Sequence, residues 1–146
     1  MPAVPFLKRL IMISESNKTS PFFKFESLRI YHKSVDFSNA IVTLSNHCQT
    51  EAHHRLVGMF VTEATQITSN IIEGSSLPKN EFADQLQKSK SCIGRCVALC
   101  TLAQKQHLID ETQETDIRNE LMELTKMIGA LILSFQKHES ASNFDL

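Results

Sequence analysis

The chain has 146 residues, of which 42% are hydrophobic and 21% are charged, and it contains four Gly, four Pro and no Trp. This composition is typical of one soluble domain with a real core, and it holds too few Gly and Pro for a turn-rich β-sandwich or barrel. The formal net charge of −1 excludes a uniformly basic, histone-like nucleic-acid binder. Because no run of about 18 apolar residues occurs, we expect no transmembrane helix and no membrane partner.

Residues 1–24 are expected to form an arm rather than regular structure. Three prolines and the polar stretch 14–20 oppose helix and strand formation, whereas residues 6–13 are apolar enough to dock on another surface. The arm lacks the uninterrupted apolar stretch and the small-residue cleavage site of a secretory signal. We therefore expect a cytoplasmic protein whose four cysteines are reduced thiols.

The first helix is predicted over residues 26–46, and it carries two apolar stripes at 100° per residue. The denser stripe, expected to face the core, consists of Ile30, Phe37, Ile41 and Leu44. The other stripe consists of Leu28, Tyr31, Val35 and Val42. This second stripe lies on nearly the opposite side, so it needs another partner, either the N-terminal arm or another subunit.

Two further helices are predicted over residues 52–73 and 78–106. The core stripe of the earlier one is Leu56, Phe60, Ala64, Ile67 and Ile71, and that of the later one is Phe82, Leu86, Ser89, Ile93, Val97 and Cys100. Gly74 is expected to end the earlier helix in the left-handed conformation. Pro78 suits the first helical position of the later one, where its missing N–H costs nothing. Gly94 lies off the core stripe, where a glycine costs about 1 kcal/mol against alanine.

The last helix is predicted over residues 111–138, with Asp110 as its N-cap and a polar tail over 139–146. Its core residues alternate four and three apart, as in the seam of an antiparallel bundle; they are Ile117, Leu121, Leu124, Ile128, Leu131 and Phe135. The prediction is an all-α, antiparallel up-down-up-down four-helix bundle over residues 25–138.

Apolar residues remain outside the predicted core on the first and last helices. They are Val35, Val42, Met122, Gly129 and Leu133. Left bare, they would form a large apolar patch, which monomers rarely expose. We therefore expect a homo-oligomer with these residues in its interface.

Three short motifs follow one another along the chain. The stretch 64–74 ends in Asn70, Ile71, Glu73 and Gly74, which fit the pattern Asn-Ile-x-Glu-Gly. The stretch 25–31 is similar to Phe-Glu-Asp-Leu-x-Val-Trp, with Tyr in place of Trp, and 79–82 is similar to Lys-Lys-Glu-Phe. In their order and spacing these motifs resemble the signature of a family of small bacterial four-helix-bundle proteins encoded in intervening sequences of 23S rRNA genes. The chain departs from the family at Cys92 and Arg95, where the family usually has Ser and Glu.

The resemblance implies an up-down-up-down bundle that often assembles into rings, commonly pentamers. A related bundle is the accessory subunit of diversity-generating retroelement reverse transcriptases, where it binds RNA and the polymerase. By analogy, the resemblance implies a nucleic-acid-associated role, with RNA, DNA or a reverse transcriptase as the partner.

Cysteines and histidines are the candidates for metal binding. Cys92 and Cys100 lie about 12 Å apart along one helix, too far to share one ion, so we expect these two and Cys96 to be buried packing residues. His47, His53 and His54 flank a turn without zinc-finger spacing, and we expect them to be structural or solvated. No catalytic motif is present, so we expect no catalytic residue, no metal, no cofactor and no enzyme.

Two polar residues of the second predicted helix fall on or near its core side. We expect the Asn70 amide to bond to the backbone or to another buried polar group. We expect Glu63 to have a partner or an edge position, because a buried unpaired carboxylate is costly. Glu73 is expected to pair with a basic residue or to cap a turn.

Residues 79–105 carry a net charge of +3, and this is the best candidate for a surface that contacts phosphates. The basic residues assigned to it are Lys88, Lys90, Arg95 and Lys105. A solvated face of a helix can carry the same charges. Two hypotheses therefore stand: a non-enzymatic adaptor associated with RNA or DNA, and a protein-interaction scaffold with no nucleic-acid role.

Overall fold

The computed structural model describes the backbone of residues 22–144 and side chains as far as residue 137. This part of the chain contains α-helices and 3-10 turns and no strand. The elements are η1 (Lys24–Ser27), α2 (Arg29–Thr43), η2 (Leu44–His47), α3 (Glu51–Ser75), α4 (Lys79–Lys105) and α5 (Glu111–Phe144). Across the described range, none of the helices combines the length and apolar character needed to cross a lipid bilayer. The predicted arm lies outside the described residues except for its last three positions.

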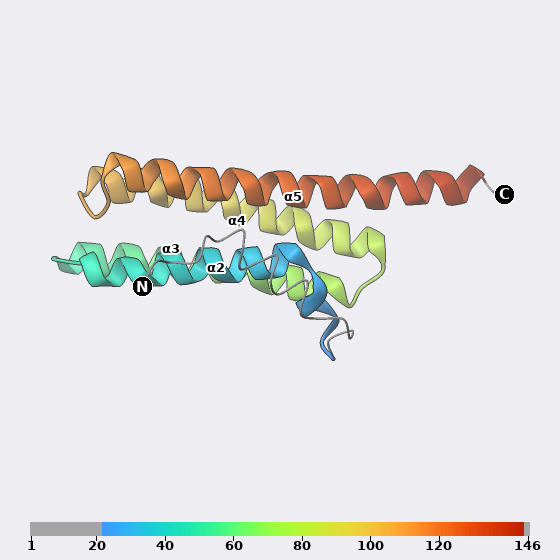
Figure 1. The fold of residues 1–146 in the computed structure, drawn as a ribbon, viewed down its shortest axis with the longest axis horizontal. Helices are drawn as coiled ribbons and strands as arrows, with labels where there is room; N and C mark the ends of the chain where they lie inside the picture. Colours follow the sequence, from blue (N-terminus) through green and yellow to red (C-terminus); the bar gives the residue numbers. More distant parts are fainter. Residues whose placement is uncertain (1–21, 145–146) are drawn as a thin grey trace, which may run out of the picture.

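Consecutive helices run in opposite directions, as the colours of Figure 1 show. His53 near the start of α3 contacts Gln106 just after α4, whereas Asn70 near the end of α3 contacts Cys92 in the middle of α4. Figure 1 shows α2 and α3 in one layer and α4 and α5 in the other, with α5 extending past the rest at its C-terminal end. The predicted all-α, up-down-up-down four-helix arrangement is confirmed.

The core lies between the two layers and is built from the predicted stripes. The fully buried side chains include Ile41, Phe60, Ile67, Ile71, Leu86, Leu121, Leu124 and Ile128. Four of the predicted core residues are only partly buried at its margin: Val97, Ile117, Leu131 and Phe135. The apolar spacing therefore predicts which side of each helix faces inward, and it overestimates burial at the edges of the stripes.

The first helix is shorter than the predicted range 26–46. Leu28 is extended, with φ −87° and ψ 125°, so the chain forms the separate turn η1 before α2 begins at Arg29. After Thr43 the helix tightens into η2. At the other end of the chain, the backbone of α5 continues to Phe144, six residues beyond the predicted end at 138. Local propensity alone does not place these boundaries.

Gly74 does not end α3 in a left-handed conformation, so that prediction is wrong. None of the described glycines has a positive φ, and α3 continues through Ser75. The glycine is needed for a different reason: a Cβ at this position would lie 2.6 Å from Cδ1 of Phe82. The absence of a side chain at Gly74 lets the first turn of α4 pack directly against the end of α3. Pro78 is the N-cap of α4 rather than its first helical residue.

The turn between α4 and α5 is held by two helix caps. His107 has a φ of 59°, and the N–H groups of His107 and Leu108 donate to the carbonyls of Gln104 and Ala103. This is the Schellman motif, with histidine at the position where glycine is usual. Asp110 accepts from the Gln113 N–H at 2.8 Å, and Gln113 Oε1 accepts from the Asp110 N–H at 2.9 Å. The predicted N-cap at Asp110 is confirmed as part of a capping box.

Candidate nucleic-acid interface

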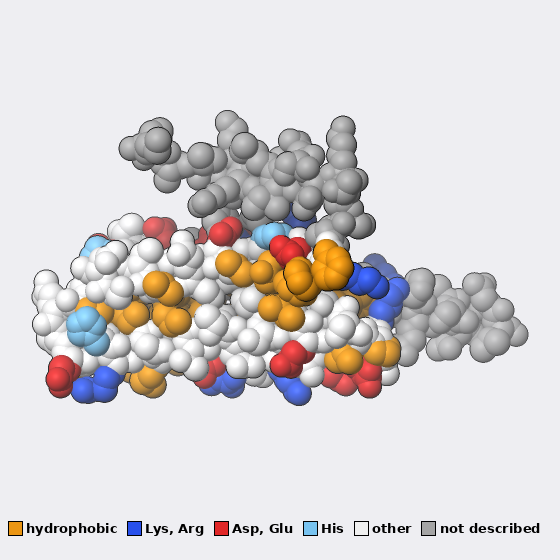
Figure 2. Space-filling model, turned by 90° about the horizontal axis from the view of Figure 1, so that it is seen from below, with side chains coloured by type: hydrophobic (Ala, Val, Ile, Leu, Met, Phe, Trp, Pro, Cys, Tyr) orange, Lys and Arg blue, Asp and Glu red, His pale blue; other side chains and the backbone are white. Residues whose placement is uncertain are grey.

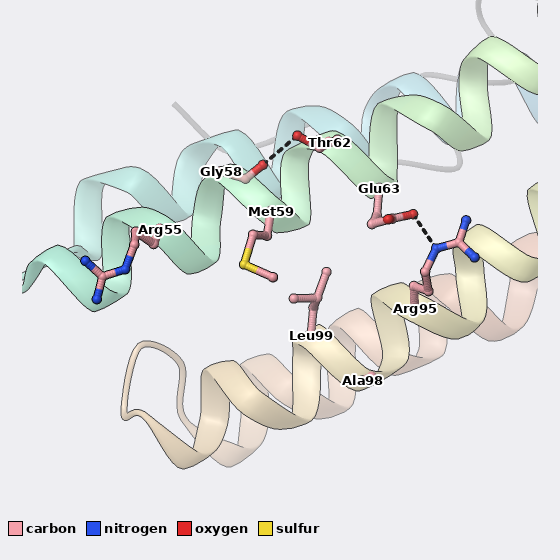
Figure 3. A pocket seen from close by; sticks show the side chains of 8 residues that line it. All are labelled: Arg55, Gly58, Met59, Thr62, Glu63, Arg95, Ala98 and Leu99. Carbon is pink, nitrogen blue, oxygen red and sulfur yellow. Dashed lines mark hydrogen bonds and ion pairs between the residues drawn. The ribbon is translucent and has the colours of Figure 1, made fainter.

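A groove of about 760 Å³ runs between α3 and α4 on the outside of the bundle. Its lining residues are Arg55, Gly58, Met59, Thr62, Glu63, Arg95, Ala98 and Leu99. Figure 3 shows Met59 and Leu99 pointing toward each other across it, with an ion pair at one end. The groove therefore has an apolar floor and charged residues at its margin.

The ion pair joins Arg95 of α4 to Glu63 of α3, with Nε to Oε2 at 2.8 Å. The same guanidinium donates through Nη2 to Sγ of Cys92 at 3.1 Å. Glu63 is a quarter exposed, so the partner that the sequence analysis expected for it is Arg95. The family resemblance puts Glu at position 95. This chain has Arg there, and the carboxylate comes from the neighbouring helix.

Asn70 is buried and contacts the same cysteine, Cys92, as Arg95, which agrees with its predicted position near the core side. Its Nδ2 points toward Cys92 Sγ at 3.8 Å, and its Oδ1 accepts from Gln66 Nε2 at 3.3 Å. Glu73 is exposed near the end of α3, and its backbone carbonyl accepts from the Ser76 hydroxyl. The four residues that match the family motif therefore have separate positions. Asn70 is buried and contacts α4, Ile71 is fully buried in the core, Gly74 lets α4 approach closely, and Glu73 is exposed.

The cysteines of α4 are buried thiols that pack in the core, as expected. Burial raises the pKa of Cys96 to about 12 and that of Cys100 to about 11. Burial also raises the pKa of Cys92, although the Arg95 charge opposes the shift. None of these three thiols is an activated nucleophile at neutral pH. In the described part of the chain, no three His, Cys, Asp or Glu side chains are grouped as they would be to hold a metal ion.

His53 is a structural residue at one end of the bundle. It is buried, its Nδ1 accepts from the Gln49 N–H at 3.2 Å, and its Nε2 lies 2.7 Å from the Gln106 carbonyl. Because Nδ1 accepts, Nε2 carries the proton and donates to that carbonyl. His53 therefore ties the turn before α3 to the end of α4, whereas His47 and His54 are exposed.

The four predicted phosphate-contacting residues do not form one patch. Lys88 and Arg95 are seven residues apart on α4 and lie within about 20° of each other around its axis, whereas Lys90 is turned about 160° away from Lys88. Lys88 and Lys105 are exposed and Lys90 is half-buried. Arg95 is 55% exposed, but Glu63 balances its charge.

Sequence reasoning missed Arg55 and Met59 on the other side of the groove. Both are exposed, and they line the groove together with Glu63 at a spacing of four residues along α3. That spacing is the signal that could have found them, because it places all three on one side of the helix, flanking its core stripe. The groove is thus lined by Arg55 from α3 and Arg95 from α4, and Lys88 lies two turns before Arg95 on the same side of α4, outside the lining.

The apolar residues predicted for one oligomer interface lie on opposite faces. Met122 lines a groove of about 340 Å³ between α4 and α5 and is half exposed, and Leu133 is also exposed. Gly129 has the same helical orientation. Val35 and Val42 lie on the side of α2 that is turned away from Lys33, which contacts α5. Because α2–α3 and α4–α5 form the two layers, these two sets cannot belong to a single continuous patch.

Lys33 closes the bundle between α2 and α5. Its side chain is 3% exposed, and its Nζ lies 3.0 Å from Glu120 Oε2 and 2.6 Å from Glu123 Oε2. The lysine lowers the pKa of Glu123 through a hydrogen bond and through its charge. The sequence analysis did not single out this cluster. The only feature of the sequence that indicated this cluster is a charged residue, Lys33, next to the core stripe of the first helix.

Comparisons with known proteins agree with this architecture. The model of the family described as 23S rRNA-intervening sequence protein matches residues 26–130, which is more than two thirds of the chain and includes α2, α3, α4 and most of α5. No curated protein and no solved structure matches the chain. The protein is therefore a member of the 23S rRNA-intervening sequence protein family.

Proposed function

We propose that this protein is a non-enzymatic adaptor that binds structured RNA on the outer face of α3 and α4. The observation that carries the proposal is the set of basic residues on this face: Arg55 and Arg95 line the α3–α4 groove, and exposed Lys88 lies two turns before Arg95 on α4, outside the lining. Lys88 and Arg95 lie about 10 Å apart along α4, so they can reach different phosphates of one strand. The resemblance to an accessory bundle that binds RNA supports RNA over DNA as the ligand.

The ion pair between Glu63 and Arg95 limits the positive charge of this face. Arg95 already donates through Nε and Nη2 to groups of its own protein. Arg55 lies 3.8 Å from Glu51 in a pair whose two members are both exposed, so Lys88 is the main side chain that supplies charge to a ligand and Arg55 contributes less. Removing the Glu63 carboxylate would return a full charge to the face. The proposal therefore predicts opposite effects for two single substitutions.

The test is the affinity for an RNA hairpin, measured by fluorescence anisotropy over a range of salt concentrations. Lys88→Glu should weaken binding and lower the slope of log affinity against log salt by about one, because one phosphate contact is lost. Glu63→Gln should strengthen binding. Lys126→Glu, an equal charge change at an exposed position of α5, is the matched control and should leave binding unchanged. A DNA duplex of the same sequence distinguishes RNA binding from general binding of nucleic acid.

A protein-interaction scaffold is the second candidate function, and the apolar floor of the same groove favours it. Met59 is 55% exposed and lies opposite Leu99, an arrangement that suits the apolar side of a partner helix. Such a partner could be a reverse transcriptase, as the family resemblance implies. If Lys88→Glu and Glu63→Gln leave RNA binding unchanged while Met59→Glu abolishes binding of a purified partner, the scaffold replaces the RNA adaptor.

Self-association through the α4–α5 face is the second part of the proposal, and the resemblance favours a pentameric ring. Met122 and Leu133 present apolar side chains there, and a Cβ at Gly129 would meet nothing within 4 Å in the single chain, which leaves room for a close neighbour. Sedimentation equilibrium should give a mass several times 16.5 kDa for the natural chain. Met122→Glu with Leu133→Glu should reduce it to that of one chain. A natural chain that sediments as a monomer at micromolar concentration contradicts this part of the proposal.

A further inference from the structure

The outer face of the α2–α3 layer carries an uncharged apolar row that the described residues cover only in part. We call it the α2–α3 face; its members are Tyr31, Val35 and Val42 of α2 and Val61 and Ile72 of α3. Val35 is 39% and Val42 is 47% exposed. Figure 2 shows hydrophobic side chains along the middle of this side of the molecule, with most charged side chains toward its edges. An apolar centre surrounded by charged residues is typical of a surface that packs against a partner.

The contacts between α2 and α3 place both halves of this row together. The Thr68 hydroxyl of α3 donates to Ser34 Oγ of α2 at 2.8 Å, which marks the line along which the helices meet. Val61 and Ile72 lie within about 40° of Thr68 around α3, on the outward side of that line. On α2, Val35 follows Ser34 directly and is turned about 100° from it around the helix axis, toward the solvent side of the line where the two helices meet. The row therefore follows the seam between the two helices on its solvent side.

Aromatic side chains connect this row to the point where the described chain begins. The rings of Phe22 and Phe23 are 5.1 Å apart, those of Phe23 and Phe25 are 5.7 Å apart, and those of Phe25 and Tyr31 are 5.0 Å apart. Phe22 is 92% exposed, yet it begins a continuous series of ring contacts that ends on the α2–α3 face. The chain before Phe22 therefore joins the bundle at one end of the apolar row.

The segment before Phe22 has the composition and the length to cover the row. Residues 4–13 hold eight apolar residues around Lys8 and Arg9, and residues 14–21 form a polar spacer. The spacer spans up to about 26 Å when extended, whereas α2, with 15 residues, is about 22 Å long. Any part of the row is thus within reach of residues 4–13 of the same chain.

We propose that residues 4–13 dock on the α2–α3 face of their own chain. A short tether holds an attached segment at an effective concentration of about a millimolar. A second copy at micromolar concentration competes poorly with a segment that is always present. Lys8 and Arg9 are compatible with such docking, because long side chains can keep their charges in water while their neighbours cover the row. This inference does not depend on RNA binding, which uses the other side of α3.

The test places a photoactivated cross-linker on the face of the full-length protein. Val42→p-benzoylphenylalanine is prepared in ordinary and nitrogen-15-labelled forms, the two are mixed, and the cross-linked peptides are identified by mass spectrometry. The proposal predicts cross-links from position 42 to residues 4–13 in which both peptides carry the same label. Cross-links that join labelled to unlabelled chains overturn it in favour of a second copy, and cross-links that do not include residues 4–13 overturn it as well.

Two controls keep the result specific. The same cross-linker at Leu133, on the opposite layer, should give no product with residues 4–13. Phe6→Glu with Leu10→Glu should lower the yield from position 42 at least about tenfold, because carboxylates in an apolar contact are costly. The spacer variant Glu15→Gln should not change it. An unchanged yield in the double variant contradicts the proposal, and far-UV circular dichroism verifies that each variant keeps its helices.

Discussion

Two glycines of this protein occupy helices for different reasons, and the same substitution should reveal the difference. A Cβ at Gly74 would lie 2.6 Å from a ring carbon of Phe82, which is itself buried against Phe135 with ring centroids 5.3 Å apart. A Cβ at Gly94 would meet nothing within 4 Å. The glycine near the end of α3 is a packing requirement, whereas the one within α4 only increases the entropy of the unfolded chain.

Gly74→Ala should therefore lower the free energy of unfolding by about 1–3 kcal/mol, since the ring of Phe82 has no room to move away. Gly94→Ala should raise it by about 0.5–1 kcal/mol. Urea denaturation followed by circular dichroism measures both values. Equal effects of the two substitutions would show that the close approach at Gly74 does not carry the energy assigned to it.

The buried thiols of α4 make stability depend on alkaline pH. In the unfolded chain Cys96 ionises near its ordinary pKa of 9.0, whereas in the fold burial raises the pKa to about 12. Above pH 9 the unfolded state has lost this proton and the folded state keeps it, so the thiol's contribution, complete below pH 9, declines as the pH rises toward 12. The expected loss is roughly 1.4 kcal/mol for each pH unit in that window.

Cys96→Ala should flatten this dependence, whatever its effect on stability at pH 7. The comparison is the slope of the unfolding free energy between pH 8.5 and 10, in the natural protein and in the variant, where most lysines are still charged. Cys48→Ala is the matched control, because that thiol is only partly buried. A variant whose slope equals that of the natural chain contradicts the prediction.

At the scale of the elements, α2 is the shortest helix and meets α5 mainly around Lys33. The ammonium is buried, but its partners Glu120 and Glu123 are 37% and 55% exposed and can be hydrated without it. Removing the lysine therefore leaves two carboxylates that water can satisfy. Removing the carboxylates takes these two counter-charges away from a buried ammonium, which costs more.

Lys33→Met, which keeps the volume of the side chain, should change the free energy of unfolding by less than about 1 kcal/mol. Glu120→Gln with Glu123→Gln should lower it by about 2–3 kcal/mol at pH 7. Because the pKa of Glu123 is lowered, its contribution is present above the ordinary carboxyl range and is lost as the pH falls below it. Denaturation at pH 7 and pH 3 measures both effects. A methionine variant less stable than the double glutamine variant contradicts the argument.

At the scale of the whole molecule, the fold could be predicted because it depends on a repeated signal. Each helix carries apolar residues that recur at helical spacing. One such residue from each of the four helices, Ile41, Ile67, Leu86 and Leu124, is fully buried. That repetition fixes the inward side of each helix and thereby the bundle. Single residues at the ends of helices carry no such repetition. Leu28 in extended conformation and His107 at a left-handed position were therefore not foreseen.

The groove was predicted only in part, because it depends on how two helices are aligned. Lys88 and Arg95 were found from the charge of α4 alone, but the sequence does not say that Glu63 lies opposite Arg95. The distance between residues 63 and 95 is set by the packing of Phe82 against Gly74 and of His53 against Gln106 at the two ends of the helix pair. Such long-range alignment is not visible in the spacing of any one helix.

The three buried cysteines on successive turns of α4 also give the protein internal reporters of its own motions. An alkylating reagent can reach Cys92, Cys96 or Cys100 only when the helices around them separate, whereas Cys48 is partly accessible in the closed bundle. Pulsed alkylation followed by mass spectrometry would thus measure how often the bundle opens at three positions along α4 in the natural chain. If α3 and α4 separate as a unit, the three thiols should be modified at the same rate, and graded rates would reveal fraying from one end.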